Sequence, residues 1–178
     1  LQSNASYDMS IVNKTFAQLG GIEEIDDYVF LVGSSAKSIS EAANTEKQNL
    51  FVQIFKPNEE VNKNNYLGGV ERSGNTSYNI NDINNSPLTP VTDYGVRWLT
   101  DYTDKNVIAP QIVKAEDKIV ILWSTENESF YTVLNSNGDT VVPVTSLGNK
   151  LLNSYEKPIY HNGEVYWVYS GDNKINLG

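Results

Sequence analysis

The chain has 178 residues, 39% of them hydrophobic and 11% aromatic, which is enough for one domain with a full core or two small domains. Its net charge of −9 argues against nucleic acid and anionic membranes as partners, because both are bound through basic patches. The absence of cysteine excludes disulfides, thiol catalysis and thiolate metal sites, and no apolar run is long enough for membrane insertion.

The first five residues are set apart from the rest. Ser3-Asn4-Ala5 resembles the remnant of a removed tag, so residues 1–5 are interpreted as a tag remnant and 6–178 as a single β domain. On this interpretation the natural N-terminus and any signal peptide precede the chain. Residues 7–13 are then predicted to form a marginal short strand.

The next part of the chain alternates strand and turn signals. Acidic residues between 23 and 27 predict a turn that leads into 28–34, an apolar run typical of a strand buried on both faces. Residues 35–48 contain a capping-box spacing and predict one or two helical turns. A further strand is predicted at 50–55, and Pro57 ends it because proline cannot donate to a sheet.

A long irregular stretch follows. Residues 58–90 are rich in Gly, Ser and Asn and offer few apolar residues to bury. Loops of this length are uncommon inside compact domains, so we interpret 56–95 as an insertion placed before a short strand at 96–102. The alternative interpretation is a degenerate repeat unit at 58–102.

The clearest strand pattern lies at 110–146. Four short β-rich runs are separated there by turn residues, which predicts a four-stranded antiparallel meander. After a connector at 150–155, strands are predicted at 158–160, 164–170 and 173–177. Asn162-Gly163 separates the first two of these strands and suits a type I′ hairpin turn.

Three of the predicted strands align with one another. The segments 28–34, 118–124 and 164–170 are each apolar and end in a serine, at Ser34, Ser124 and Ser170. The last two serines are 46 residues apart and the first two are 90 apart, close to twice that spacing. A spacing in the forties suits four-stranded units. These units are predicted at 15–102 with the insertion 56–95, at 109–146, and at 157–178 together with 7–13.

This repeat of apolar strand, Trp or Tyr, and terminal Ser resembles the repeats in β-propeller-like regions of bacterial cell-surface and exported proteins. The resemblance covers residues 15–55 and 96–178. It implies an all-β fold of four-stranded meanders arranged as propeller blades, in an extracellular or cell-surface protein. Because propellers have at least about four blades, the chain is expected to form a partial propeller, with a β-sandwich as the alternative. A homodimer or a neighbouring domain of the same chain could complete the ring.

Few residues suggest catalysis or metal binding. The single histidine, His161, lies in a predicted turn and is interpreted as a surface residue. No other nitrogen or sulfur ligand supports a zinc site. Calcium is the one cofactor whose oxygen ligands are abundant, at 79–85, 101–104 and 126–128, although solvated loops explain them as well. The candidates for the paired catalytic carboxylates of a glycosidase are the acidic residues at strand starts, although turns also favour such residues. They are Asp26, Asp27, Glu116 and Asp117.

Aromatic side chains are the better indication of binding. Most of the three Trp residues are expected in the core between units, while aromatics on the other strand faces could stack on sugar rings or peptides. We therefore expect a non-catalytic binding or protein-interaction module whose ligand is carbohydrate or peptide. The alternatives are a fragment of a propeller glycoside hydrolase and a structural spacer domain. The candidate ligand-binding residues are Tyr94, Trp98, Tyr102, Tyr166 and Tyr169.

Overall fold

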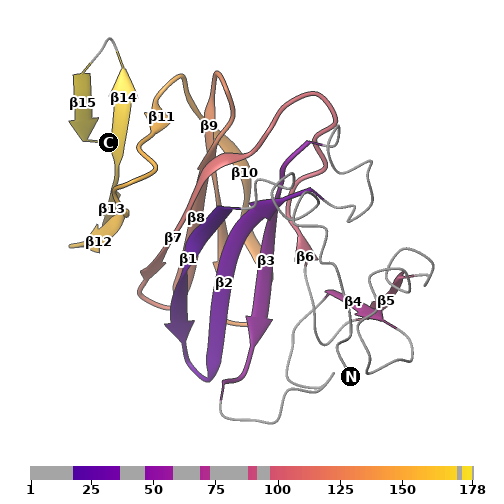
Figure 1. Ribbon diagram of the computed structural model, residues 1–178. Coiled ribbons are helices and arrows are strands. Elements are labelled where there is room, and N and C mark those ends of the chain that lie inside the picture. Colours follow the sequence, from indigo (N-terminus) through magenta and orange to yellow (C-terminus); the bar gives the residue numbers. More distant parts are fainter. Residues whose placement is uncertain are drawn as a thin grey trace, which may run out of the picture.

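The computed structural model describes residues 18–36, 47–57, 69–72, 88–91, 97–171 and 174–177 (Figure 1). Every regular element in these ranges is a β-strand, and every strand pair is antiparallel. The predicted all-β fold of four-stranded antiparallel meanders is therefore confirmed. Residues 37–46, which hold the capping-box spacing of the helical turn expected within 35–48, and the strand expected at 7–13 fall outside these ranges, while Ser35 lies in a strand.

The first sheet contains the N-terminal strands. Its order is β1-β2-β3-β6, and β6 pairs with β3 through Val52 and Arg97. Two strands from the interval between β3 and β6, β4 and β5, pair with each other and not with this sheet. The bounds are β1 (Gln18–Ile25), β2 (Tyr28–Ser35), β3 (Asn49–Phe55), β4 (Gly69–Arg72), β5 (Leu88–Val91) and β6 (Arg97–Trp98).

The buried side-chain amide of Asn49 holds the segment that follows β6 against the first sheet. Asn49, which is 2% exposed, accepts hydrogen bonds at Oδ1 from the Tyr102 N–H (2.6 Å) and the Thr100 hydroxyl (2.9 Å). Its Nδ2 donates to the carbonyl of Tyr102 at 3.1 Å. Since buried polar groups are stable only when paired, these bonds fix residues 100–102 beside the start of β3.

The second sheet is the meander predicted at 110–146. Its order is β10-β9-β8-β7, and its strands are joined consecutively along the chain. The bounds are β7 (Ile108–Ala115), β8 (Lys118–Ser124), β9 (Ser129–Asn135) and β10 (Thr140–Gly148).

The main core lies between the first and second sheets, which face each other in Figure 1. Strands β1 and β7 can approach each other closely because residue 20 is a glycine. A Cβ at this position would lie only 2.8 Å from the backbone of Pro110 on β7. Alternate side chains of a strand point to opposite faces, so only every second residue of β2, β3 and β8 enters this core. They are Phe30 and Val32, Leu50, Val52 and Ile54, and Ile119, Ile121 and Trp123.

A third unit covers the opposite face of the second sheet. Val120 and Leu122 of β8 point to this face, and Val165 and Trp167 of the third unit pack there. The unit combines the β12–β13 hairpin with a sheet of order β11-β14-β15. The bounds are β11 (Leu151–Leu152), β12 (Ile159–His161), β13 (Glu164–Tyr166), β14 (Val168–Gly171) and β15 (Lys174–Leu177). The described strands do not close into a ring, and a partial propeller and a layered sandwich both accommodate them.

Several boundaries differ from those expected. Glu23 and Glu24 belong to β1 and not to a turn, because Ile25 is needed in the core and extends the strand to the two-residue turn Asp26-Asp27. The strand at 28–34 is fully buried on one face only, since its other face is half-exposed. The strand at 164–170 is divided at Trp167, and the connector at 150–155 contains β11, which pairs with β14.

The first hairpin of each unit has the same backbone signature. The turn residues Asp26, Glu116 and Asn162 have positive φ angles of 53°, 56° and 51°. Gly163 also has a positive φ, 87°, as the type I′ turn predicted at Asn162-Gly163 requires. The three turns thus share one residue with a positive φ.

Buried polar side chains of the second sheet hold the third unit in place. The hydroxyl of Ser124 accepts a hydrogen bond from the Leu152 N–H at 2.9 Å and exchanges another with Ser129 at 2.7 Å. Gln111 Nε2 donates to the carbonyls of Asn153 (2.5 Å) and Glu156 (2.9 Å). The bonds to Leu152, Asn153 and Glu156 join residues that are 28 to 45 positions apart.

We predict that Ser124→Ala destabilises the chain by about 1–3 kcal/mol, because it leaves a buried amide without an acceptor. Ser170→Ala is the matched control, since Ser170 occupies the aligned position but is exposed, and it should change stability by less than about 0.5 kcal/mol. Urea unfolding of the two variants measures the difference. Equal midpoints would contradict the assigned role of Ser124.

Candidate functional site

The candidate site is a groove on the side of the third unit that faces away from the second sheet. Its volume is about 440 Å³, within the usual range of ligand sites. The walls are mostly apolar, with charged groups at the rim. We call it the outer groove; its lining residues are Glu156, Lys157, Ile159, His161, Tyr166, Trp167 and Val168.

The hairpin register explains why these residues share a face. Ile159 pairs with Tyr166 and His161 pairs with Glu164, so the four side chains project on one side of the β12–β13 hairpin. Tyr160 and Val165 form the pair between them and project toward the second sheet. The two-residue turn fixes this register, because a slip of one residue would reverse both faces.

A second hollow lies between the hairpin and the second sheet. This inner cavity has a volume of about 320 Å³ and is lined only by apolar and aromatic side chains. Trp167 lines both the inner cavity and the outer groove, so its ring separates them. The residues of the inner cavity are Val120, Leu122, Tyr131, Val133, Leu147, Val165 and Trp167.

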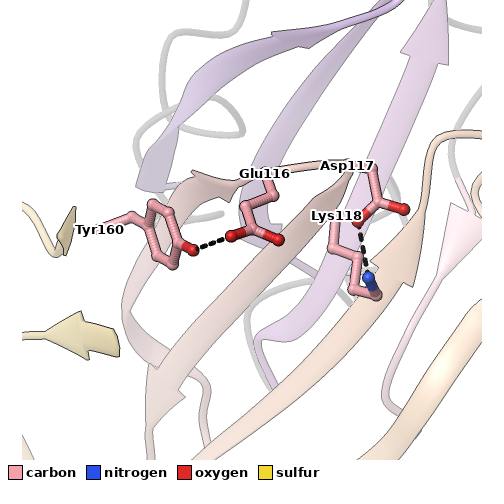
Figure 2. A network of polar contacts seen from close by, with 4 residues as sticks. All are labelled: Glu116, Asp117, Lys118 and Tyr160. Carbon is pink, nitrogen blue, oxygen red and sulfur yellow. Dashed lines mark hydrogen bonds and ion pairs between the residues drawn. The ribbon is translucent and has the colours of Figure 1, made fainter. Parts of the chain in front are cut away.

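Hydrogen bonds to carboxylates orient the two tyrosines of the hairpin. The Tyr160 hydroxyl donates to Glu116 Oε1 at 2.6 Å, which ties β12 to the β7–β8 turn (Figure 2). The Tyr166 hydroxyl donates to Glu164 Oε2 at 2.5 Å beside the outer groove. Each bond stabilises the protonated phenol next to a negative charge, so both tyrosine pKa values are raised.

The neighbouring turn residues form a separate contact. Lys118 Nζ lies 2.6 Å from Asp117 Oδ1, and this hydrogen bond lowers the pKa of the Asp117 carboxyl (Figure 2). Both side chains are largely exposed, with 42% and 78% of their surface accessible. Such an exposed pair contributes little to stability.

We predict that Glu116→Gln lowers the pKa of Tyr160 toward its ordinary value, because the amide that replaces the carboxylate carries no charge. Tyr166 serves as the internal control, since its partner Glu164 is unchanged. The ring-carbon NMR signals of the two tyrosines, followed through alkaline pH, measure both values. An unchanged Tyr160 titration would show that the contact in Figure 2 is not made in solution.

Of the five predicted ligand-binding residues, the structure places only Tyr166 in the outer groove. Trp98 packs edge-on against Phe51 at 5.8 Å on the first sheet. Tyr102 packs against the main core and lies beneath Lys105, and Tyr169 lies beneath Lys150. The four described residues therefore do not form one site, because Trp98 and Tyr102 lie with the first sheet and Tyr166 and Tyr169 with the third unit. Tyr94 lies outside the described residues.

Sequence reasoning missed Ile159 and assigned Trp167 only to the core. The signal for both was the Asn162-Gly163 turn, which sets the hairpin register and hence the faces of β12 and β13. That Trp123 belongs to the core between units is confirmed: it is fully buried and stacks on Phe130 at 5.6 Å.

The four carboxylates considered for catalysis lie in two exposed hairpin turns. Asp26 and Asp27 connect β1 to β2, and Glu116 and Asp117 connect β7 to β8. Within the described part of the chain, no Asp or Glu side chain is buried. The positions are those of ordinary turn residues.

The described ranges contain neither a cluster of metal ligands nor a membrane-spanning helix. No group of three or more His, Asp or Glu there is placed to hold a metal ion. Of the calcium candidates, Glu126 accepts hydrogen bonds from the backbone and side chain of Asn106, and 79–85 lie outside these ranges. No helix among these residues is long and apolar enough to cross a membrane.

Comparisons with known proteins add no homologue. The chain matches no family model, no curated protein and no solved structure.

Proposed function

We propose that the chain is a non-catalytic protein-interaction module of an exported bacterial protein and binds a polypeptide through the outer groove. The observation that carries this proposal is Ile159, an isoleucine that is 60% exposed on a β-strand beside Tyr166 and Trp167. Clustered exposed apolar side chains mark sites of association. The exported location rests on the polar, tyrosine-rich composition and the absence of cysteine.

The backbone beside the groove supports a polypeptide ligand. Among the described strands, β13 pairs only with β12, so its other edge has no ladder partner. An extended peptide can pair with such an edge through its backbone and place alternate side chains in an adjoining groove. Ile159, Trp167 and Val168 offer apolar contacts to those side chains.

A carbohydrate ligand is less well supported by the same groove. Aromatic rings could stack on a sugar, but sugar hydroxyls also need several hydrogen-bonding partners. The Tyr166 hydroxyl is already bound to Glu164, and Ile159 and Val168 offer none. Glu156, Lys157, His161 and the Trp167 indole are left as the hydrogen-bonding side chains of the described lining. A glycosidase would need two carboxylates near the bond that is cleaved. Of the acidic residues that the structure describes, only Glu156 lines the groove.

Because the chain has no cysteine, Lys157→Cys at the rim introduces a single site for an environment-sensitive fluorophore. We expect a capped six-residue peptide of alternating valine and threonine to change its fluorescence saturably, and cellohexaose to have no effect. The same fluorophore at Tyr155→Cys, which is 92% exposed outside the groove, should not respond.

Ile159→Asp in the labelled chain should weaken peptide binding at least about tenfold, which corresponds to the burial of one aliphatic side chain. Val144→Asp on β10 is the matched control, because Val144 is also exposed, at 47%, and lies outside the groove. A fluorescence response to cellohexaose alone would show that the groove binds a carbohydrate and not a peptide. A response to neither probe would contradict the proposal.

A further inference from the structure

The three units of the chain stack in one direction. When the strands ending in Ser34, Ser124 and Ser170 are aligned, Phe30 of β2 corresponds to Val120 of β8, and Val32 corresponds to Leu122. Phe30 and Val32 face the second sheet, while Val120 and Leu122 face the third unit. The same positions of the repeat therefore point to the next unit in each case.

The opposite face of each aligned strand receives the preceding unit. Ile119 and Ile121 of β8 pack against the first sheet. Their counterparts are Val165 and Trp167, which pack against the second sheet. The two interfaces within the chain thus use equivalent positions, and the stack runs head to tail.

Among the described residues, no further unit covers either end of this stack. On the first sheet, Val29 and Leu31 occupy the positions of Ile119 and Ile121, but they are only half-buried. On the third unit, Tyr166 and Val168 occupy the positions of Phe30 and Val32 and line the outer groove.

We name these two ends by their residues. The head face consists of the residues that the cross-strand pairs place on the outer side of β1, β2 and β3, which are Leu19, Ile22, Glu24, Val29, Leu31, Gly33, Phe51, Gln53 and Phe55. The cross-strand pairs Ile22–Leu31 and Leu19–Gly33 place the β1 residues on this face, where Leu19 is 67% and Ile22 is 54% exposed. The tail face consists of the outer-groove residues, among them Ile159, Tyr166 and Val168.

We propose that the head face of one copy of this chain docks on the tail face of a second copy, repeating the interface that joins the units within each chain. The inference rests on the proposed function, because the tail face is the outer groove, and it names the partner of that site. The contact is heterologous, and such contacts close into a ring when the rotation between copies permits. Two copies with three units each would give six units, within the usual range of about four to eight blades.

A second copy is the expected partner because the two faces belong to the same chain and apolar side chains predominate on each. Glu24 and Gln53 are the polar members of the head face, and Glu156, Lys157 and His161 those of the tail face. Each face is built from the repeat positions that already pack against one another twice inside the molecule. Charge acts against this association, because every copy carries a net charge of −9. Raising the salt concentration screens that repulsion, so the dimer should become more stable as salt is added.

Light scattering and sedimentation of the unmodified chain test the proposal. We expect twice the mass of one chain, with a dissociation constant that falls when salt rises from about 0.1 M to about 0.5 M. Ile22→Lys on the head face and Ile159→Lys on the tail face should each weaken dimerisation at least about tenfold, because each buries a charge in an apolar contact. Both residues are more than half exposed, so neither substitution should prevent folding.

Val144→Lys is the matched control and should leave the dimer intact, because Val144 lies on β10 and outside both faces. An equimolar mixture of the Ile22→Lys and Ile159→Lys variants retains one unmodified head and one unmodified tail, and should form dimers that neither variant forms alone. A monomer at all concentrations, or equal loss in the control, would overturn the inference.

The peptide titration separates this inference from the proposed function. A monomeric chain whose labelled Lys157→Cys variant still binds the valine–threonine peptide would overturn the second-copy inference and leave the polypeptide-binding groove standing. A chain that dimerises through Ile22 but not through Ile159, and binds no peptide, would overturn both.

Discussion

The structure depends on one strand, β8, that is apolar on both faces. Ile119, Ile121 and Trp123 alternate along it with Val120 and Leu122. Because alternate residues of a strand point to opposite sides of its sheet, such a strand is stable only when both faces are covered. Each covered side chain contributes about 1.5–3 kcal/mol. The first sheet covers one face and the third unit the other, and this layering places the outer groove.

Apolar contacts are non-directional, so polar groups decide where the third unit lies on the second sheet. Ser124 holds β11 itself through the Leu152 N–H, and Gln111 holds the backbone that follows β11 through the carbonyls of Asn153 and Glu156. Tyr160 reaches Glu116 in the β7–β8 turn. With the β12–β13 hairpin held in this way, one of its faces packs on the second sheet and the other carries Ile159 and Tyr166. The groove is therefore a consequence of how the layers are joined.

Local sequence signals predicted the parts of the fold that depend on local chemistry. The meander at 110–146 and the turn at Asn162-Gly163 follow from strand alternation and from the positive φ that glycine permits. The division at Trp167 and the strand β11 were not predicted, since they depend on contacts with a distant sheet. For the same reason the sequence did not indicate Ile159 as a candidate ligand-binding residue, because the exposure of one isoleucine depends on which layer its hairpin covers.

Amide hydrogen exchange along β8 tests the layered arrangement most directly. As the inner strand of the middle layer, β8 is hydrogen-bonded to β7 and β9 and covered on both faces. Its amides should exchange more slowly than those of β2, which is also bonded on both sides but has one half-exposed face. Exchange in β8 as fast as in β2 would show that the third unit does not cover the second sheet, and would contradict the account.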